Sequence, residues 1–252
     1  MHGYKPIVVV IPSYNNRNWY EKNLNSVFLQ NYPNYRVIYI DDCSTDGTSE
    51  GVKNYLQKKS KKNNITYIRN PRRLGALQNF YNTVHNLTRD EEIVVILDGD
   101  DWLGHKSVLS EINEFYTKKG VWLTHGKLME WPQGTVAWSI PIPPEIVKEN
   151  KFREYRCPSH LKTFYSWLFK LIKKEDLFYK GEFCPMTGDM AIMFPMIEMA
   201  GERHGFIKEV NYIYNIANVL NDNKVDPTLQ REIDYYIRNL PRYQRLPKGY
   251  FD

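Results

Sequence analysis

The first half of the chain alternates between short, continuously apolar runs and segments with helical periodicity. The apolar runs are "IVVVI" (7–11), "RVIYI" (36–40), "ITYI" (65–68) and "IVVIL" (93–97). Helical spacing is found over residues 16–29, in "STDGTSEGVKNYL", over 75–87 and over 106–116. Strands that are apolar on both faces are typical of a parallel sheet covered on both sides. We therefore predict an α/β fold with a Rossmann-like, mostly parallel central sheet and helices on both faces.

The second half of the chain has a different pattern. "WPQGTVAWSIPIPPE" (131–145) is rich in proline and glycine, which predicts an irregular loop or a short hairpin. The spacing predicts helices over 161–172 and 190–199, the second ended by Gly201. "EVNYIYNI" predicts a strand, and Asp226-Pro227 predicts the start of a last helix that ends near residue 239.

Composition excludes several classes of protein. A net charge of +5 suits an anionic small substrate and does not require nucleic acid as a partner. Cys43, Cys157 and Cys184 lie far apart, which argues against a disulfide framework or a zinc knuckle. The apolar runs are too short to cross a bilayer, and no signal peptide is recognised. We expect a cytoplasmic protein without a transmembrane segment, and association with a membrane surface through a partner stays open.

The strand ends carry the informative polar segments. In open parallel sheets, ligands bind beyond the carboxyl ends of the strands. The segments that follow the four runs are "PSYN", "DDCSTDGT", "RNPRRLG" and "DGDD". Neither a GxGxxG nor a GxxxxGK[ST] phosphate-binding motif is present, and HExxH and GxSxG are also absent.

An apolar run leads directly into Asp98, Asp100 and Asp101. Carboxylates this close repel one another and are costly to desolvate. Mg²⁺ and Mn²⁺ prefer oxygen ligands, and a bound cation would let the carboxylates stay ionised. Spacing alone supports equally an Asp-rich turn before the helix over 106–116.

Four motifs together resemble the inverting glycosyltransferases of family 2. They are "VVVIPSYN" (8–15), "YIDDCSTDGT" (39–48), "LDGDDW" (97–102) and "TGDMA" (187–191), which occur in the family's order over roughly residues 5–215. The resemblance implies a GT-A fold, a nucleotide-sugar donor and one domain over residues 1–252. Its nucleotide-binding half would span 1–103, its acceptor and catalytic half 104–216, and its C-terminal loop and helix 217–252.

The resemblance also implies a nucleotide site. Pro12, Tyr14, Asn15 and Asp42 match the positions that hold the nucleotide. Tyr14 would stack on the base, and Asp42 would accept a hydrogen bond from a uracil-like N–H, which favours a UDP-sugar. Arg72, or its neighbour Arg73, matches a basic residue near the diphosphate.

The acidic residues receive roles by the same resemblance. Asp100 would bind Mn²⁺ or Mg²⁺ directly, Asp98 would reach the ribose or the metal, and Asp101 would touch the donor sugar. Asp189 matches the general base, while Gly188 stands where the family usually has Glu. The implied reaction is a single displacement with inversion, in which Asp189 takes the proton of the acceptor hydroxyl.

Several alternatives stay open at this point. A catalytically silent domain that binds a nucleotide sugar or a glycan is one, and a nucleotidyltransferase is another. The acceptor could be a glycan, a lipid-linked sugar or a protein side chain. Trp131 and Trp138 fit either an acceptor platform or a packed loop, His160 is interpreted as structural, and Lys224 is a candidate for contact with the diphosphate.

Overall fold

The computed structural model describes residues 3–58, 64–137, 139–247 and 249–251. Its described part contains a nine-stranded sheet with the strand order β3-β2-β1-β4-β8-β6-β11-β5, and β7 pairs with β6. The strands are β1 (Ile7–Ser13), β2 (Tyr35–Asp41), β3 (Ile65–Arg69), β4 (Ile93–Ile96), β5 (Trp102–Leu103), β6 (Leu123–Trp131), β7 (Thr135–Val136), β8 (Thr163–Tyr165) and β11 (His204–Asn215). The strands β9 (Phe178–Tyr179) and β10 (Glu182–Phe183) form a separate ribbon.

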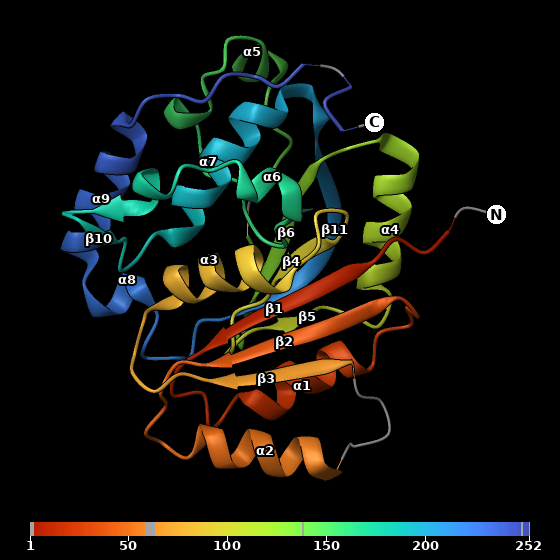
Figure 1. Ribbon diagram of the computed structural model, residues 1–252, viewed down its shortest axis with the longest axis vertical. Helices are drawn as coiled ribbons and strands as arrows, with labels where there is room; N and C mark the ends of the chain where they lie inside the picture. The colour runs from red at the N-terminus through yellow and green to blue at the C-terminus, as the bar shows by residue number, and fades with distance from the viewer. Residues whose placement is uncertain (1–2, 59–63, 138, 248, 252) are drawn as a thin grey trace.

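The sheet is parallel over its N-terminal half. Strands β1, β2, β3 and β4 are parallel to one another, and β6 is parallel to β11. Strand β8 runs antiparallel between β4 and β6, and the short β5 is antiparallel to β11. The prediction of an α/β fold with a mostly parallel sheet is confirmed. The arrowheads of β1, β2 and β3 reach the same edge of the sheet (Figure 1).

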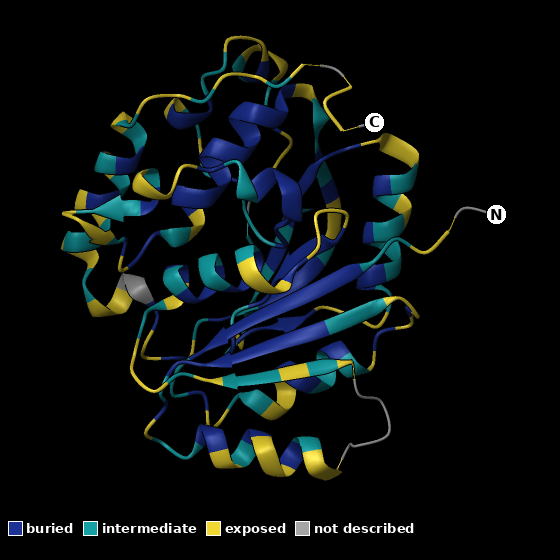
Figure 2. Cartoon of the chain, in the orientation of Figure 1, coloured by how far each residue is buried: buried dark blue, intermediate teal, exposed yellow. Residues whose placement is uncertain are grey.

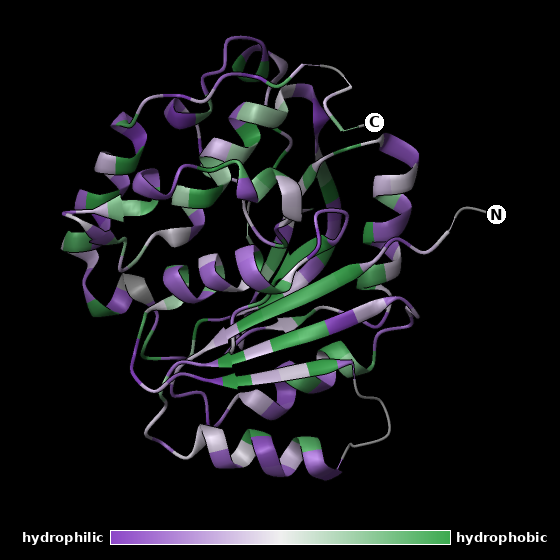
Figure 3. Cartoon of the chain, in the orientation of Figure 1, coloured by the Kyte–Doolittle hydropathy of each residue, from purple (hydrophilic) through white to green (hydrophobic). Residues whose placement is uncertain are grey.

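Helices cover both faces because the central strands are apolar on both sides. In β1, Ile7, Val9 and Ile11 belong to one hydrophobic cluster, and Val8 and Val10 belong to the other. The first cluster includes α1 (Tyr20–Phe28), α2 (Thr48–Lys58) and α4 (Val108–Lys119), and the second includes α3 (Ala76–Leu87), α6 (Ser166–Lys170) and α7 (Gly188–Ala200). Strand β1 is buried along its length and hydrophobic up to its last two residues, whereas the edge strand β3 is partly exposed (Figures 2 and 3).

The remaining elements lie mainly in the second half of the chain. They are α5 (Pro144–Lys148), α8 (Asp222–Val225), α9 (Pro227–Asn239) and the 3-10 turns η1 (Phe152–Glu154), η2 (Lys174–Leu177) and η3 (Gly201–Arg203). The predicted start of the last helix is confirmed, because Asp226 caps α9 by accepting hydrogen bonds from the N–H groups of Thr228 and Leu229. Within the described residues, no helix is both long and apolar enough for a membrane crossing.

The prediction of one helix over residues 161–172 is wrong for its first part. Residues Thr163–Tyr165 form β8, and only Ser166–Lys170 form a helix. Thr163 and Phe164 are fully buried between β4 and β6, where a β-branched and an aromatic side chain suit a pleated surface. This segment forms a strand because it pairs with β4 and β6. Residue spacing within the segment cannot show such long-range pairing.

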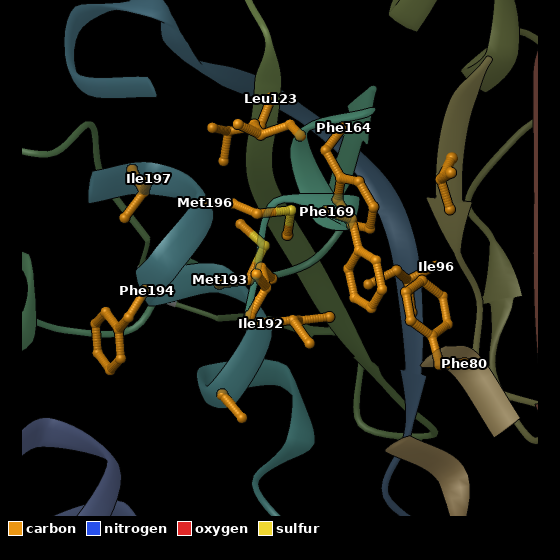
Figure 4. Packing of buried hydrophobic residues seen from close by; sticks show 14 of the residues in the cluster. Phe80, Ile96, Leu123, Phe164, Phe169, Ile192, Met193, Phe194, Met196 and Ile197 are labelled. Carbon is orange, nitrogen blue, oxygen red and sulfur yellow. The ribbon is translucent and has the colours of Figure 1, made fainter. Parts of the chain in front are cut away.

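Helix α7 is buried on all sides. All residues from Met190 to Ala200 are buried. In Figure 4, Met193 and Met196 lie toward Phe164 and Phe169, whereas Phe194 points to the other side of the helix. A helix that is apolar all round lies inside a protein and is fixed by packing. The first turn of α7 therefore starts from a rigid support.

A buried ion pair joins α7 to the C-terminal elements. Arg153 donates to Glu198 through Nε–H at 2.6 Å and through Nη2–H at 2.9 Å, and the two side chains are 2% and 0% exposed. Arg153 also donates to the carbonyl of Ile237, and Glu198 accepts from the N–H of Tyr243. Each guanidinium nitrogen and both carboxylate oxygens thus take part in a hydrogen bond, and the pair connects η1, α7, α9 and the C-terminal segment.

We expect Glu198→Ala to destabilise the fold strongly, because it leaves the Arg153 guanidinium buried without its counter-ion. Loss of one partner of a buried pair costs about 3–5 kcal/mol. Urea unfolding measures the loss. Glu114→Gln is the control, because Glu114 pairs with Lys118 on the surface and its removal should cost less than about 1 kcal/mol. Equal losses in the two variants would contradict the role given to the buried pair.

Candidate active site at the carboxyl ends of the strands

The sheet brings the predicted strand-end segments together. Strand β1 ends at Ser13, which is paired in register with Asp41 at the end of β2. On the other side of β1, the N–H of Gly99 donates to the carbonyl of Pro12, so the acidic turn follows β4 beside "PSYN". The segments that were predicted to share one edge of the sheet therefore do so.

Asp101 is an internal support of the acidic turn. Its side chain is fully buried. Its Oδ1 accepts from the N–H of Asn215 at 2.7 Å, and its Oδ2 lies 2.5 Å from the hydroxyl of Tyr212. The implied contact between Asp101 and a donor sugar is not favoured by this geometry, because both carboxylate oxygens point into the protein.

Asp98 and Asp100, the predicted metal ligands, are partly exposed. Asp98 Oδ2 lies 3.2 Å from the Tyr212 hydroxyl, and Asp100 Oδ2 accepts from Asn218 Nδ2 at 2.6 Å. Burial raises the pKa of both carboxyl groups, and the charge of Asp100 helps to raise the pKa of Asp98 to about 7. A raised carboxyl pKa means that the ionised form is destabilised by desolvation and by its neighbours.

This pair of carboxylates fits a divalent cation that protein and substrate hold jointly. Among the described residues, no three His, Cys, Asp or Glu side chains gather as a ready metal site. Mg²⁺ and Mn²⁺, however, commonly bind through one or two carboxylates plus substrate phosphates. Asp98 and Asp100 supply such a pair, and a cation beside them would offset the effects that raise their pKa.

The backbone of the acidic turn is held from α1 and β1. Asn23 Nδ2 donates to the carbonyls of Asp98 and Asp101, each at 2.8 Å. Gly99 has no space for a side chain, since a Cβ there would lie 2.6 Å from Ser13 Oγ and 2.7 Å from Asn16 Nδ2. The glycine between the two candidate metal ligands is therefore required by the packing of the turn against β1.

Asp42 organises the loop that follows β3. Its carboxylate accepts from Asn70 Nδ2 at 2.8 Å and from the N–H groups of Leu74 and Gly75 at 2.9 and 2.8 Å. Burial would raise the pKa of Asp42, but these hydrogen bonds, together with Asn79, lower it below the usual value. A carboxylate has about four acceptor positions, so at most about one is left for a nucleobase.

The other predicted nucleotide residues lie in the same area. The Arg73 guanidinium stacks 4.0 Å above the ring of Tyr14, and Arg72 is exposed in the same loop. Asn15 connects the β1 and β2 loops: its N–H donates to Ser44 Oγ, and its Oδ1 accepts from the N–H of Thr45. The structure thus assigns Asn15 a part in holding the loops, and it places Arg73 rather than Arg72 against Tyr14.

Asp189 lies in the first turn of α7 and is bound to a buried lysine. Lys162 Nζ donates to Asp189 Oδ2 at 2.6 Å, and the side chains are 1% and 44% exposed. Burial would raise the pKa of Asp189, but the Lys162 ammonium outweighs it and lowers that pKa. Gly188 lets α7 approach α3, because a Cβ there would lie 3.2 Å from Leu77 Cβ.

Sequence reasoning missed Lys162 and the residues that hold the acidic turn, Tyr212, Asn215 and Asn218. The one available signal was a lone lysine in the otherwise apolar stretch around "HLKTF". Lys224, predicted near the diphosphate, instead donates to the carbonyls of Ile216 and Asn218 and so holds its own loop.

Trp131, for which an acceptor platform and a packed loop were both open, lies in a packed aromatic cluster. The ring of Trp131 meets those of Trp19 and Trp102 edge-on, with centroids 5.6 and 5.5 Å apart. Lys22 Nζ lies 3.6 Å above Trp102 and 4.4 Å above Trp131. Trp138 lies outside the described residues. For Trp131 the structure favours the packed-loop interpretation.

Comparison with known proteins now assigns the family. A family model described as Glycosyl transferase family 2 matches residues 8–178. The chain belongs to this family. Relatives include the putative teichuronic acid biosynthesis glycosyltransferase TuaG of Bacillus subtilis, 41% identical over 69 residues. The poly(ribitol-phosphate) beta-N-acetylglucosaminyltransferase TarS of Staphylococcus aureus is 28% identical over 107 residues. These matches cover 27% and 40% of this chain, but only 27% and 17% of the relatives.

Solved structures of similar shape include two sugar-transferring enzymes. S. aureus TarS 1–349 in complex with UDP-GlcNAc has a TM-score of 0.66 at 17% identity, over 92% of this chain and 65% of that one. The mannosyltransferase PcManGT of Pyrobaculum calidifontis, in complex with GDP-Man and Mn²⁺, has a TM-score of 0.65 at 17% identity. That match covers 96% of this chain and 66% of PcManGT. The GT-A fold implied by the motifs is confirmed.

We expect Gly99→Ala to destabilise the protein by about 1–3 kcal/mol, because the added methyl group meets Ser13 and Asn16. Chemical unfolding gives the difference from the parent chain. Gly3→Ala is the control, since a Cβ at Gly3 meets nothing within 4 Å. An unchanged stability of Gly99→Ala would show that β1 moves aside at no cost.

We expect Asp98 to make the metal-free protein less stable as the pH rises from about 4 to about 7. Its pKa is higher in the folded than in the unfolded chain, so between these two pKa values the folded state binds more protons and its stability falls as the pH rises; above about pH 7 this loss is complete. Asp98→Asn should remove this contribution, and its stability relative to the parent should increase with pH. Urea unfolding in EDTA across this range tests the sign, with Asp90→Asn as the control.

Proposed function

We propose that the chain is an inverting, metal-dependent glycosyltransferase that transfers a sugar from a UDP-sugar to an acceptor hydroxyl. The observation that carries the proposal is a half-exposed Asp189 bound by Lys162, whose carbonyl accepts from the N–H of Ile96 at the end of the strand that leads to Asp98. In this proposal the donor sugar would lie between the base and the cation site. Family membership supports the reaction class.

The donor site is proposed at the ends of β1 and β2. Pro12, Tyr14, Asn15 and Asp42 would surround the nucleoside, and Arg72 or Arg73 would meet the diphosphate. For Tyr14 to stack on a base, the Arg73 guanidinium must leave its ring or lie on the opposite face of the base. The TarS structures with UDP and UDP-GlcNAc support a uracil nucleotide, and the Mn²⁺ in PcManGT supports the metal.

The reaction proceeds as one displacement at the anomeric carbon. The acceptor oxygen forms a bond to that carbon while the bond to the diphosphate oxygen breaks, and the electron pair leaves with UDP. The acceptor proton passes to the carboxylate of Asp189. A cation held by Asp98 and Asp100 would stabilise the negative charge on the leaving diphosphate. Inversion follows, because no protein nucleophile takes part.

A glycan hydroxyl is the acceptor class that we propose. The names of TuaG and TarS refer to teichuronic acid and to poly(ribitol-phosphate), which are both polyanionic. A chain with a net charge of +5 attracts such an acceptor. We also propose that the protein acts in the cytoplasm, where a partner would hold it at a membrane surface.

The silent-domain alternative rests on Gly188 in place of the family's Glu. A Cβ at Gly188 would lie 3.2 Å from Leu77 Cβ, which is one structural reason for the glycine, and Asp189 keeps the carboxylate. Donor binding without any turnover would nevertheless favour a nucleotide-sugar-binding domain over an enzyme.

Calorimetry with UDP, GDP and ADP tests the donor site. We expect UDP to bind best in Mn²⁺, binding to weaken at least tenfold in EDTA, and Asp100→Asn to abolish the metal effect. Asp90→Asn should bind like the parent, because Asp90 pairs with Lys170 outside the site. Preference for GDP or ADP would overturn the uracil assignment, and failure to bind any diphosphate would overturn the transferase.

Turnover of a UDP-sugar panel with glycan acceptors tests the base. We expect Asp189→Asn to lower the turnover rate by about 10²–10⁴, the range of general base catalysis, and to leave UDP affinity within about threefold. NMR of the product should show the inverted anomer. Full activity of Asp189→Asn would exclude this residue as the base.

A further inference from the structure

Lys162 has a buried ammonium group, and burial of such a charge is energetically unfavourable. Its side chain is 1% exposed, and burial of an ammonium group requires compensation by partners. Its carbonyl accepts from the N–H of Ile96 at the end of β4, so it lies beside the strand that leads to Asp98. Its Nζ lies 2.6 Å from Asp189 Oδ2 and 3.4 Å from His160 Nε2.

This ion pair differs from the structural pair between Arg153 and Glu198. There both partners are closed off, and Glu198 is bound on both oxygens. In the Lys162–Asp189 pair only the cation is buried, while the carboxylate is 44% exposed. Asp189 Oδ1 accepts from the N–H of Met190 at 2.8 Å. The carboxylate is thus oriented from inside the protein and open toward the outside.

The groups around the Lys162–Asp189 pair favour the charged forms of both side chains. Asp98, Cys157 and His160 are the titratable groups that influence Lys162 or Asp189 most. Burial and the Lys162 charge lower the pKa of His160 well below its usual value, so His160 is neutral. Burial would lower the pKa of Lys162, but Asp189 and the other anionic groups raise it, so Lys162 stays an ammonium.

We propose that Lys162 is a positioning residue for transfer: it fixes the Asp189 carboxylate toward the acceptor and favours the ionised form. The inference rests on the proposed function, in which Asp189 is the base. After Asp189 has taken the acceptor proton, the adjacent ammonium favours release of this proton to water through the exposed side of the carboxylate. Lys162 thereby returns the base to its active form for the next turnover.

Lys162→Met tests the proposal with little change in side-chain volume. We expect kcat/KM to fall at least tenfold, while the Kd for UDP changes less than twofold. Without the cation, the pKa of Asp189 rises, so the acid limb of the kcat–pH profile should move to higher pH. Lys170→Met removes a lysine from a pair outside the site and should leave the profile unchanged.

Two further variants make the result decisive. Lys162→Arg keeps the positive charge, so kcat should fall while the acid limb stays at its original pH. This variant tests the proposal also if Lys162→Met does not fold. In the Asp189→Asn background, Lys162→Met should cause no further loss, because the residue acts only through the base.

The outcomes separate this inference from the proposed function. Full activity of Asp189→Asn would refute the base itself. If Asp189→Asn loses activity but the acid limb does not move in Lys162→Met, only the role of Lys162 is refuted. A shifted acid limb in Lys162→Arg would refute that role as well. Additive losses in the double variant would also refute that role.

Discussion

Electrostatic repulsion at the end of β4 is the constraint on which the rest of the site depends. Asp98, Asp100 and Asp101 follow a buried strand, and burial raises the pKa of all three. Such a turn keeps its shape only if other groups hold it. Tyr212 and Asn215 on β11 bind the carboxylate of Asp101. These contacts connect the turn after β4 to a strand from the second half of the chain.

The acidic residues and the candidate nucleotide site are supported by different parts of the molecule. The acidic turn is held by hydrogen bonds from α1 and β11, and the base candidate is held by the buried helix α7. The nucleotide side is built from loops, where Asp42 orders the segment after β3 and Arg73 covers Tyr14. Adjustment on donor binding is therefore expected in the loops, whereas the acidic turn is attached to α1 and β11 and Asp189 to the buried helix α7.

The sequence predicted those parts of the fold that depend on local periodicity. All four parallel strands of the first half and the capped helix α9 lie where spacing and Asp226-Pro227 place them. Strand β8 was mistaken for a helix, because its place is defined by β4 and β6 and not by its own pattern. The strand-end residues were found by motif, but Lys162, Tyr212 and Asn218 belong to no motif. Their roles arise from long-range contacts that residue spacing cannot show.

Two acidic groups of the site differ in the positive charge that lies near them. The Lys162 ammonium is inside the protein on the Asp189 side, and its charge lowers the pKa of that carboxyl. The same charge also acts on Asp98, but there burial and Asp100 prevail, and the pKa stays near 7. The charge of Lys162 therefore prevails at Asp189 but not at Asp98. In the function proposed above, a cation arriving with the diphosphate would supply the positive charge beside the acidic pair.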